Sequence, residues 1–291
     1  MRTTTLVVLS VFLLLVAPAG RGAENLVISS GSESGYYHSV ARGLRAVLRS
    51  QYGTALEIHT SAGSLENLTL LDDPASAVAI ALTQADALKH YIDDYPEFAS
   101  KHVELSDVGE ECVFLITGKR KGIKSVADLK AEGSRALAVG RLGSGAAITW
   151  EYMNRLEPSF RNTQPVNVEM IEALLGLRQT TPSSAIAAAM MVQRPRTLSA
   201  PVEIVLDRPE DYEIVPIREG DIGPASLEGG RPVYSFEKVS VGFGRDYRAT
   251  FDTICTRGLL IAARAKLTDA QLKLLGEAMA TSRGYIAPGT D

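Results

Sequence analysis

Hydrophobic and polar positions follow two alternating patterns from about residue 25 onward. Short apolar runs typical of buried strands, at 25–29 and 77–82, are each followed by a segment in which apolar residues recur at helical spacing. In the first such segment, Val40, Leu44, Val47 and Leu48 form the apolar stripe. This repeated order of strand and helix indicates a parallel α/β sheet.

The same order continues to the end of the chain. Further strands are predicted at 56–59, 113–117, 136–140, 166–171 and 258–263, and further helices at 65–71, 148–156, 172–179 and 267–279. Ser125 and Asp128 have the spacing of a capping box at a helix start. The apolar stretch 185–192 fits either a helix or a buried strand, and residues 219–250 predict a long irregular connection.

Residues 1–23 have the features of a secretory signal peptide. Met1-Arg2 precedes an apolar run at 6–16, and small residues follow at 17–19 and 22–23. The run is shorter than the roughly 20 apolar residues that span a bilayer, which favours a cleaved signal over a membrane anchor. We therefore expect a periplasmic protein, with cleavage after Ala19 or Ala23 left open.

Composition narrows the class of protein. The 291 residues are 45% hydrophobic and 22% charged, as in ordinary globular proteins, with a formal net charge of −4. No run of basic residues interleaved with aromatic residues occurs, so we expect no nucleic-acid partner. Cys112 and Cys255 are the two cysteines, and export would allow one disulfide if their strands are neighbours. Two buried free thiols are the alternative.

Two distant segments share one layout. Residues 112–129 and 255–275 each run from an apolar strand through a basic residue and a short turn to a capped helix. We interpret them as the two crossings between lobes. The predicted first lobe comprises 24–115 and 250–291, and the second comprises 116–249. The expected fold class is α/β with a two-lobe architecture, each lobe a mostly parallel sheet flanked by helices and joined by hinge strands.

Three turns rich in Gly and Ser, named here the three glycine turns, lie between a predicted strand and the next helix, at 30–37, 61–67 and 140–145. A helix N-terminus exposes unpaired N–H groups, and glycine lets an anion approach them closely. Because ligands of open α/β sheets gather at the carboxyl ends of strands, we expect the turns to share a cleft. The candidate ligand-binding residues are Gly31, Ser32, Tyr36, Tyr37, Ser61, Gly63, Ser64, Asn67, Gln84, Arg141, Gly143, Ser144 and Gly145.

No pattern indicates catalysis, a metal or a cofactor. The four histidines lack metal-ligand spacing, and the glycine fingerprints of nucleotide-binding folds are missing. The adjacent acid pairs Asp93-Asp94 and Glu110-Glu111 receive no role, since neighbouring residues on a strand or helix point different ways. We therefore expect a protein that is not an enzyme, that binds no cofactor and that has no metal-ligand motif; the sequence leaves open whether a metal assists ligand binding.

Several of these segments together resemble one known family. The stretches 31–37, 61–68, 83–86, 122–129, 139–145 and 251–253 are similar to those of TAXI-type solute receptors of TRAP transporters, which have the type 2 periplasmic binding protein fold. The chain departs from the family at 187–191, where Ala-Ala-Ala-Met-Met replaces a strand like Asp-Ala-Phe-Phe, and at Ala146, where Thr is common.

The resemblance implies a function. Such a receptor, as a monomer, captures a small organic acid or an amino acid that is glutamate-like in some members, and delivers it to a TRAP-type membrane permease. It places contacts at Gly31, Ser32, Tyr36, Ser64, Asn67, Gln84, Ser144 and Gly145. The alternatives are a substrate-binding or ligand-sensing subunit of another uptake or signalling system, and an enzyme built on the same two-lobe fold.

Overall fold

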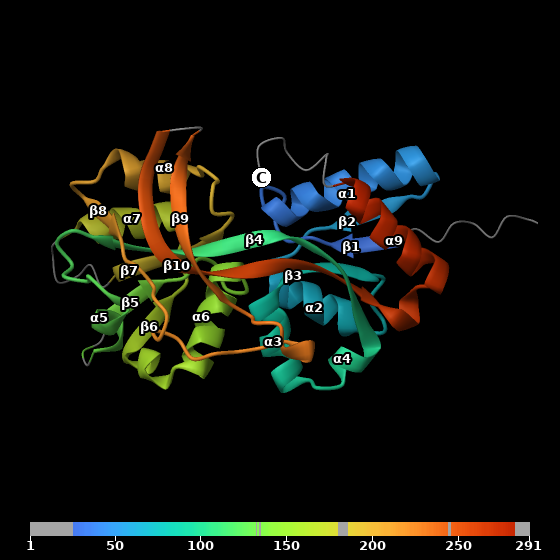
Figure 1. Cartoon of the computed structure of the whole chain (residues 1–291), viewed down its shortest axis with the longest axis horizontal. Helices are drawn as coiled ribbons and strands as arrows, with labels where there is room; N and C mark the ends of the chain where they lie inside the picture. The colour runs from blue at the N-terminus through green and yellow to red at the C-terminus, as the bar shows by residue number, and fades with distance from the viewer. Residues whose placement is uncertain (1–25, 132, 134, 180–185, 244–245, 283–291) are drawn as a thin grey trace, which may run out of the picture.

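The computed structural model describes residues 26–282, except 132, 134, 180–185 and 244–245. Two α/β lobes lie side by side, and two long strands run through both (Figure 1). Strand order along the sheet is β2-β1-β3-β10-β4-β7-β5-β6, with β8 paired to β4 and β9 to β10. The predicted signal peptide and the first predicted strand residue lie outside the described part of the chain.

The first lobe contains both ends of the described chain. Its strands β1, β2 and β3 are parallel, and β10 pairs with β3 in the antiparallel direction. Its elements are β1 (Leu26–Ser29), α1 (Tyr36–Tyr52), β2 (Leu56–His59), α2 (Ser64–Asp72), β3 (Ile80–Gln84), α3 (Ala85–Asp94), α4 (Phe98–Lys101), the 3-10 turn η3 (Arg264–Lys266) and α9 (Asp269–Ser282).

The second lobe is built from the middle of the chain. Its strand β5 is parallel to both β6 and β7. Its elements are α5 (Val126–Lys130), β5 (Arg135–Ala138), α6 (Gly145–Leu156), the 3-10 turn η1 (Pro158–Asn162), β6 (Thr163–Val166), α7 (Met170–Arg178), β7 (Ile186–Gln193), α8 (Ala200–Asp207), β8 (Tyr212–Ile214) and β9 (Ser235–Phe243).

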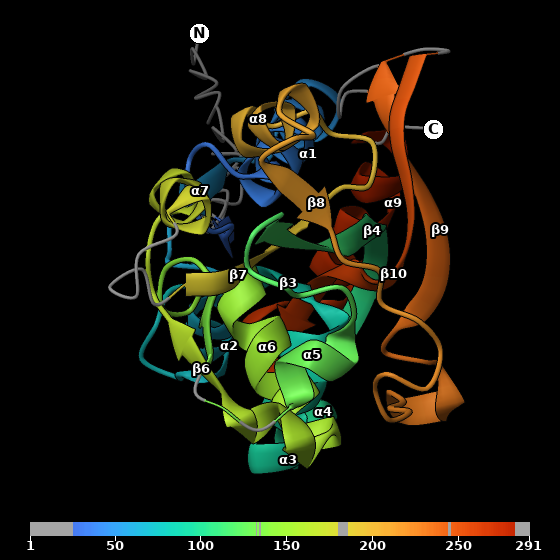
Figure 2. The same cartoon turned by 90° about the vertical axis from the view of Figure 1, so that its left-hand side faces the viewer.

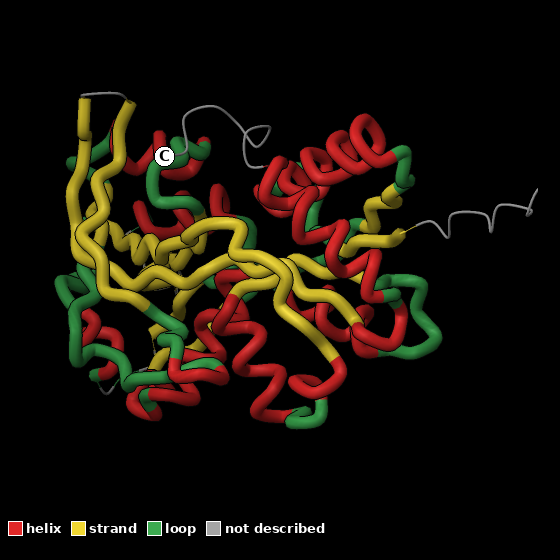
Figure 3. The backbone as a smooth tube through the Cα atoms, turned by 45° about the vertical axis from the view of Figure 1, so that its right-hand side comes forward, coloured by secondary structure: helices red, strands yellow, loops and turns green. Residues whose placement is uncertain are grey.

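The two hinge strands are β4 (His102–Gly118) and β10 (Asp246–Ala263). They pair with each other from the first lobe up to the pair Cys112–Cys255, and there they part. Beyond this point β4 continues along β7 and β10 continues along β9. The tube view shows both strands crossing the whole molecule (Figure 3), and the side view shows the long β9–β10 hairpin along one edge (Figure 2).

Sequence patterns predicted most elements correctly. The apolar stripe Val40, Leu44, Val47 and Leu48 is fully buried on α1, and the capping box of Ser125 and Asp128 is present at α5. The ambiguous stretch at 185–192 is a strand, β7.

Two predictions were wrong. Residues 166–171 are not a strand, because β6 ends at Val166 and α7 begins at Met170, whose helical period buries Ala173, Leu174 and Leu177. Residues 219–250 are not irregular throughout, since they contain β9 and the start of β10. Polar residues such as Lys238 and Ser240 stand along this hairpin, so it lacks the continuous apolar run of a buried strand.

Part of that segment forms a third connection between the lobes. We call residues 224–234, between β8 and β9, the strap. Its residues Leu227 and Val233 are buried in an apolar cluster with first-lobe residues, and Arg231 forms a two-pronged ion pair with Glu104 of β4. The strap therefore leaves the second lobe, packs on the first and returns. No helix among the described residues has the length and apolarity to cross a membrane.

Candidate functional site

The three glycine turns meet where the two lobes face each other. Gly63, which precedes α2, is so close to the second lobe that a Cβ atom there would lie 2.5 Å from the carbonyl oxygen of Gly143. A Cβ atom on Gly143 would in turn lie 3.6 Å from that of Ala62. Within the first lobe, the Gly31 carbonyl accepts a hydrogen bond from the Ser61 N–H at 3.1 Å. The lobes are therefore closed on each other in this structure.

Two helices begin at these turns without a side-chain cap. Gly35 precedes α1 and Gly63 precedes α2, and neither can cap the free N–H groups of its helix. The third helix, α6, is capped by Ser144, whose Oγ accepts a hydrogen bond from the Ala147 N–H at 3.3 Å. The starts of α2 and α6 lie close together across the two lobes, and their positive ends make this a suitable environment for an anionic group.

Three polar side chains line the base of this place, and we call them the polar floor: Gln84, Thr256 and Glu111. Gln84 of β3 pairs with Gly258 of β10, and Thr256, two residues earlier, pairs with Glu111 of β4. Directly paired residues of antiparallel strands share a face, and so do residues two apart. All three side chains therefore stand on the same face of the hinge strands.

The polar floor is incompletely hydrogen-bonded. Gln84 and Thr256 are each only 2% exposed, yet Nε2 of Gln84 and Oγ1 of Thr256 have no hydrogen-bond partner among the described residues. An unpaired buried polar group costs about 1–3 kcal/mol. The Gln84 amide also lies against the start of α6, because a Cβ atom on Gly145 would be 2.4 Å from its Oε1. Both groups therefore remain able to form a hydrogen bond with another molecule.

Two tyrosines at the start of α1 cover the other end of the polar floor. The Tyr37 hydroxyl donates to Oε2 of Glu111 at 2.5 Å, and its ring lies over Gly258, where a Cβ atom would be 3.1 Å away. Tyr36 donates to the Val108 carbonyl at 2.5 Å, and its ring packs under the Arg194 guanidinium, which follows β7. Burial raises the pKa of Glu111 to about 7, with a smaller opposing effect from the Tyr37 hydrogen bond.

A second buried carboxyl joins the lobes beside this site. Asp86, at the start of α3, accepts from Thr149 of α6 at 2.6 Å, from the Tyr234 hydroxyl of the strap at 3.0 Å and from the Ala87 N–H at 2.8 Å. Burial raises the pKa of Asp86, while these hydrogen bonds lower it. Since its oxygens are already bound, Asp86 holds the lobes together and is not placed to take a ligand.

Several predicted site residues have partners within the protein. Asn67 accepts hydrogen bonds from Ser29 and Ser61 and donates to the Leu82 carbonyl at 2.6 Å, so it fixes the second turn. Ser64 donates weakly to Gln84 Oε1 at 3.4 Å. Ser32 is exposed, and its carbonyl accepts from the Gly35 N–H at 2.9 Å.

Arg141 lies apart from the other predicted site residues. Its side chain is 77% exposed and forms an ion pair with Glu169 at the start of α7. The structure thus gives it a partner on the surface of the second lobe.

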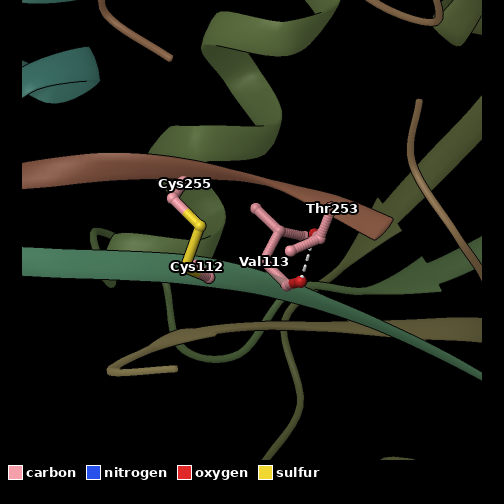
Figure 4. Close-up of a disulfide and its surroundings, with 4 residues drawn as sticks. All are labelled: Cys112, Val113, Thr253 and Cys255. Carbon is pink, nitrogen blue, oxygen red and sulfur yellow. Dashed lines mark hydrogen bonds between the residues drawn. A yellow bond between two sulfur atoms is a disulfide. The ribbon is translucent and has the colours of Figure 1, made fainter. Parts of the chain in front are cut away.

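Sequence reasoning missed Glu111, Thr256, Asp86 and Arg194. One signal could have found the first two. If Cys112 and Cys255 are assumed to pair, the preceding and following residues, Glu111 and Thr256, must face each other on the opposite side of the strands. The structure does join the two cysteines in a disulfide, at the point where the hinge strands part (Figure 4).

Other features of the described chain lie outside this site. A pocket of about 130 Å³ opens between α3, α4 and the strap, with Phe98, His102, Leu227 and Arg231 among its lining residues. Among the described residues, one group of potential metal ligands occurs, Glu110 with Cys112 and Cys255, and its two sulfurs are bonded to each other.

Comparison with known proteins agrees with this architecture. The model of the NMT1-like family matches residues 28–168. XAC2383 from Xanthomonas citri bound to ATP is similar over 88% of this chain and 82% of its own, with 12% identity and a TM-score of 0.53. The same protein bound to chloride ion matches over 90% and 87%, with 12% identity and a TM-score of 0.51.

A protein that binds a small organic anion has a comparable fold. The alkanesulfonate-binding protein SsuA from Xanthomonas axonopodis pv. citri, bound to MOPS, matches over 90% of this chain and 73% of its own, with 11% identity and a TM-score of 0.50. A search of curated protein sequences gives no match. At these identities the likeness shows the fold alone, an α/β fold of two lobes.

Proposed function

We propose that this chain is an extracytoplasmic solute-binding protein that captures a small organic anion or amino acid between its lobes and delivers it to a TRAP-type membrane permease. The main support for the proposal is one observation. Glycine turns from both lobes meet over the polar floor, where Gln84 and Thr256 are buried without hydrogen-bond partners. A polar solute held there would supply the missing partners.

The positive helix ends favour an anionic group on the solute. It would accept hydrogen bonds from N–H groups at the starts of α2 and α6, near Gly63 and Gly145, and from Nε2 of Gln84. The Tyr37 ring and the Thr256 hydroxyl would contact the remainder of the solute. Arg141 and Asn67 are left out of the proposed contacts because each already has a partner in the protein.

Solute exchange would require the lobes to separate at the hinge strands. The proposed lobes are 24–115 with 250–291, and 116–249. Separation would pull α6 away from α2 and α3 and expose Ile148 and Tyr152, which are 1% exposed in an apolar cluster shared by both lobes. Burial of such a side chain is worth about 1.5–3 kcal/mol, so the closed state is favoured even without solute. Slow solute exchange, limited by opening, should follow.

Calorimetry on protein stripped of ligand by unfolding and refolding tests the binding step. A panel of dicarboxylates, 2-oxo acids and amino acids should contain a solute that binds with one-to-one stoichiometry. Gly63→Ala should weaken its binding, because the added Cβ would strike the Gly143 carbonyl. Gly53→Ala is the matched control, since Gly53 also has a positive φ but has no atom within 4 Å of the added Cβ. An empty panel would contradict the proposal.

Delivery needs a separate test. In proteoliposomes containing a TRAP permease from the same genome, the protein should support solute uptake driven by an ion gradient. Uptake that instead depends on ATP and another transporter would support the alternative of a different uptake system. The resemblance of segments 31–37, 61–68 and 139–145 to TAXI receptors supports the first outcome.

A further inference from the structure

The proposed function leaves two classes of solute, organic anions without an amine and amino acids. The polar floor differs between its two ends in a way that bears on this choice. At the Gln84 end, the unpartnered group is an N–H donor, and the starts of α2 and α6 lie beside it. This end therefore suits an anionic group such as a carboxylate.

The Glu111 end has the opposite character. Glu111 is 8% exposed, and Tyr37 is the one hydrogen-bond partner that the described residues give its carboxyl group, at Oε2. Thr256, directly opposite in the strand register, has a buried hydroxyl without a partner. A carboxylate accepts hydrogen bonds and attracts positive charge, so this end suits a donor on the solute.

Charged groups of both signs lie near the Glu111 end of the polar floor. The carboxyl of Asp86 raises the pKa of Glu111 and the Arg194 guanidinium lowers it, so both act on this end of the floor. A dicarboxylate reaching from Gln84 to Glu111 would place its second negative charge against a buried carboxylate. A protonated amine would meet the same carboxylate as a charge-assisted hydrogen bond.

The spacing suits a small molecule. Gln84 and Glu111 are two strands apart across the sheet and two residues apart along it, or roughly 12 Å between Cα atoms at standard sheet spacings. Both side chains extend from the same face and shorten that gap. A solute of amino-acid size would reach between them.

We propose that the solute is a zwitterion, with its anionic group at Gln84 and the helix ends and its protonated amine at Glu111, which makes Glu111 the residue that selects for the amine. This inference rests on the proposed function. It also explains why a carboxyl group is buried at this position although burial raises its pKa to about 7.

Binding of such a solute should depend on pH. The titratable and charged groups that face Glu111 are Tyr37 of α1, Asp86 of α3 and Arg194 after β7. Near neutrality Glu111 of the empty protein is partly protonated, and a protonated amine binds its ionised form better. Affinity for the zwitterion should therefore rise between pH 6 and pH 8, while affinity for an analogue without the amine should not rise.

Matched pairs of an amino acid and the 2-oxo acid with the same carbon skeleton test the inference. Titrated into ligand-free protein at pH 8, the amino acid of the binding pair should bind at least about 10-fold more tightly, a difference of 1.4 kcal/mol. If the 2-oxo acid binds as tightly or more tightly, the inference is overturned while the proposed function stands. If the whole panel fails to bind, the proposed function fails as well.

Two neighbouring variants assign the selectivity to one side chain. Glu111→Gln should remove the preference for the amine, whereas Glu110→Gln should keep it, because Glu110 points to the opposite face of β4. Thermal melts establish that both variants are folded. Should Glu111→Gln not fold, the wild-type preference measured at pH 6 and pH 8 decides: it should shrink at least 3-fold at pH 6, and an unchanged preference overturns the role of Glu111.

Discussion

The two faces of the hinge strands, one residue apart in sequence, have opposite characters. On one face, Cys112 and Cys255 are bonded to each other, and Thr253 beside them donates to the Val113 carbonyl at 2.6 Å (Figure 4). On the other face, Glu111 and Thr256 stand opposite each other, and the Thr256 hydroxyl has no partner among the described residues. On the first face these groups are bonded to each other. On the second, a buried hydroxyl lacks a partner among the described residues, as the proposed ligand site requires.

The largest effect is expected from removing the disulfide. Cys112 and Cys255 are 143 residues apart in sequence, and a cross-link over such a loop stabilises the folded state by about 5 kcal/mol in the chain-entropy description. In urea unfolding, the Cys112→Ala, Cys255→Ala double variant should have a free energy of unfolding that is lower by most of this amount. Its solute affinity, where it is still folded, should change less than 3-fold, because the ligand-binding face is the opposite one.

The same measurement in dithiothreitol is the control. In dithiothreitol, the free energy of unfolding of the wild type should fall to that of the double variant. Equal stability of the two proteins under oxidising conditions would show that the cysteines are free thiols.

The second-largest effect on stability is expected at the face of the hinge strands that bears Glu111 and Thr256. The folded pKa of Glu111, about 7, lies above its reference value of 4.5, so the folded state binds this proton more tightly than the unfolded state. The group's contribution to stability is therefore full below pH 4.5 and falls as pH rises to 7, by about 3 kcal/mol. Without solute, Glu111→Gln should gain stability over wild type by about this amount between pH 4.5 and pH 8. A constant difference across that range would contradict a buried titrating Glu111.

A smaller loss of stability is expected at Asp86, whose carboxyl oxygens already accept hydrogen bonds within the protein. Thr149→Val removes the hydroxyl that donates to Asp86 at 2.6 Å across the lobes. A hydrogen bond to a buried charged group is worth about 2 kcal/mol, so unfolding should become easier by that amount. Thr69→Val, on the exposed side of α2, should change stability by less than about 0.5 kcal/mol. Equal effects of the two variants would mean that Asp86 does not join the lobes.

Gly145→Ala should act on binding more than on stability. The added Cβ would push the Gln84 amide from its position at the start of α6 and weaken solute binding about 10-fold, or 1.4 kcal/mol. Gly276→Ala in α9 is the matched control, because no atom lies within 4 Å of its added Cβ. Calorimetric titration of both variants measures the difference in affinity. Identical affinities would show that Gln84 is not part of the binding site.

The smallest effect is expected at Arg141. Its ion pair with Glu169 is exposed to solvent, which screens the attraction between the two charges, so the pair contributes little to stability. Arg141→Ala should change solute affinity less than 2-fold. A larger loss would show that Arg141 turns from Glu169 to the solute.

Sequence patterns predicted the structure correctly where neighbouring residues determine it. The stripe of Val40 and Leu44, the capping box at Ser125 and the strand-turn-helix order each follow from neighbouring residues, and together they predicted two α/β lobes. The β9–β10 hairpin escaped prediction because polar residues interrupt its apolar pattern, and the strap escaped prediction because its apolar contacts are with first-lobe residues distant in sequence.

The candidate site also has one part that the sequence predicted and one part that it did not. The three glycine turns were visible in the sequence because a turn between strand and helix has its own composition. Glu111 and Thr256 were not visible in the sequence, because only the pairing register of two strands that are distant in sequence brings them together. Arg141 stood beside a turn in sequence, yet its side chain pairs with Glu169.

The most direct test of the central claim is a crystal structure of the protein with the solute found by calorimetry. The solute is expected between the lobes, with its anionic group within hydrogen-bond distance of Gln84 Nε2 and of N–H groups at the starts of α2 and α6. A solute bound instead in the pocket between α3, α4 and the strap, beside Phe98 and Arg231, with the polar floor still unpartnered, would contradict it.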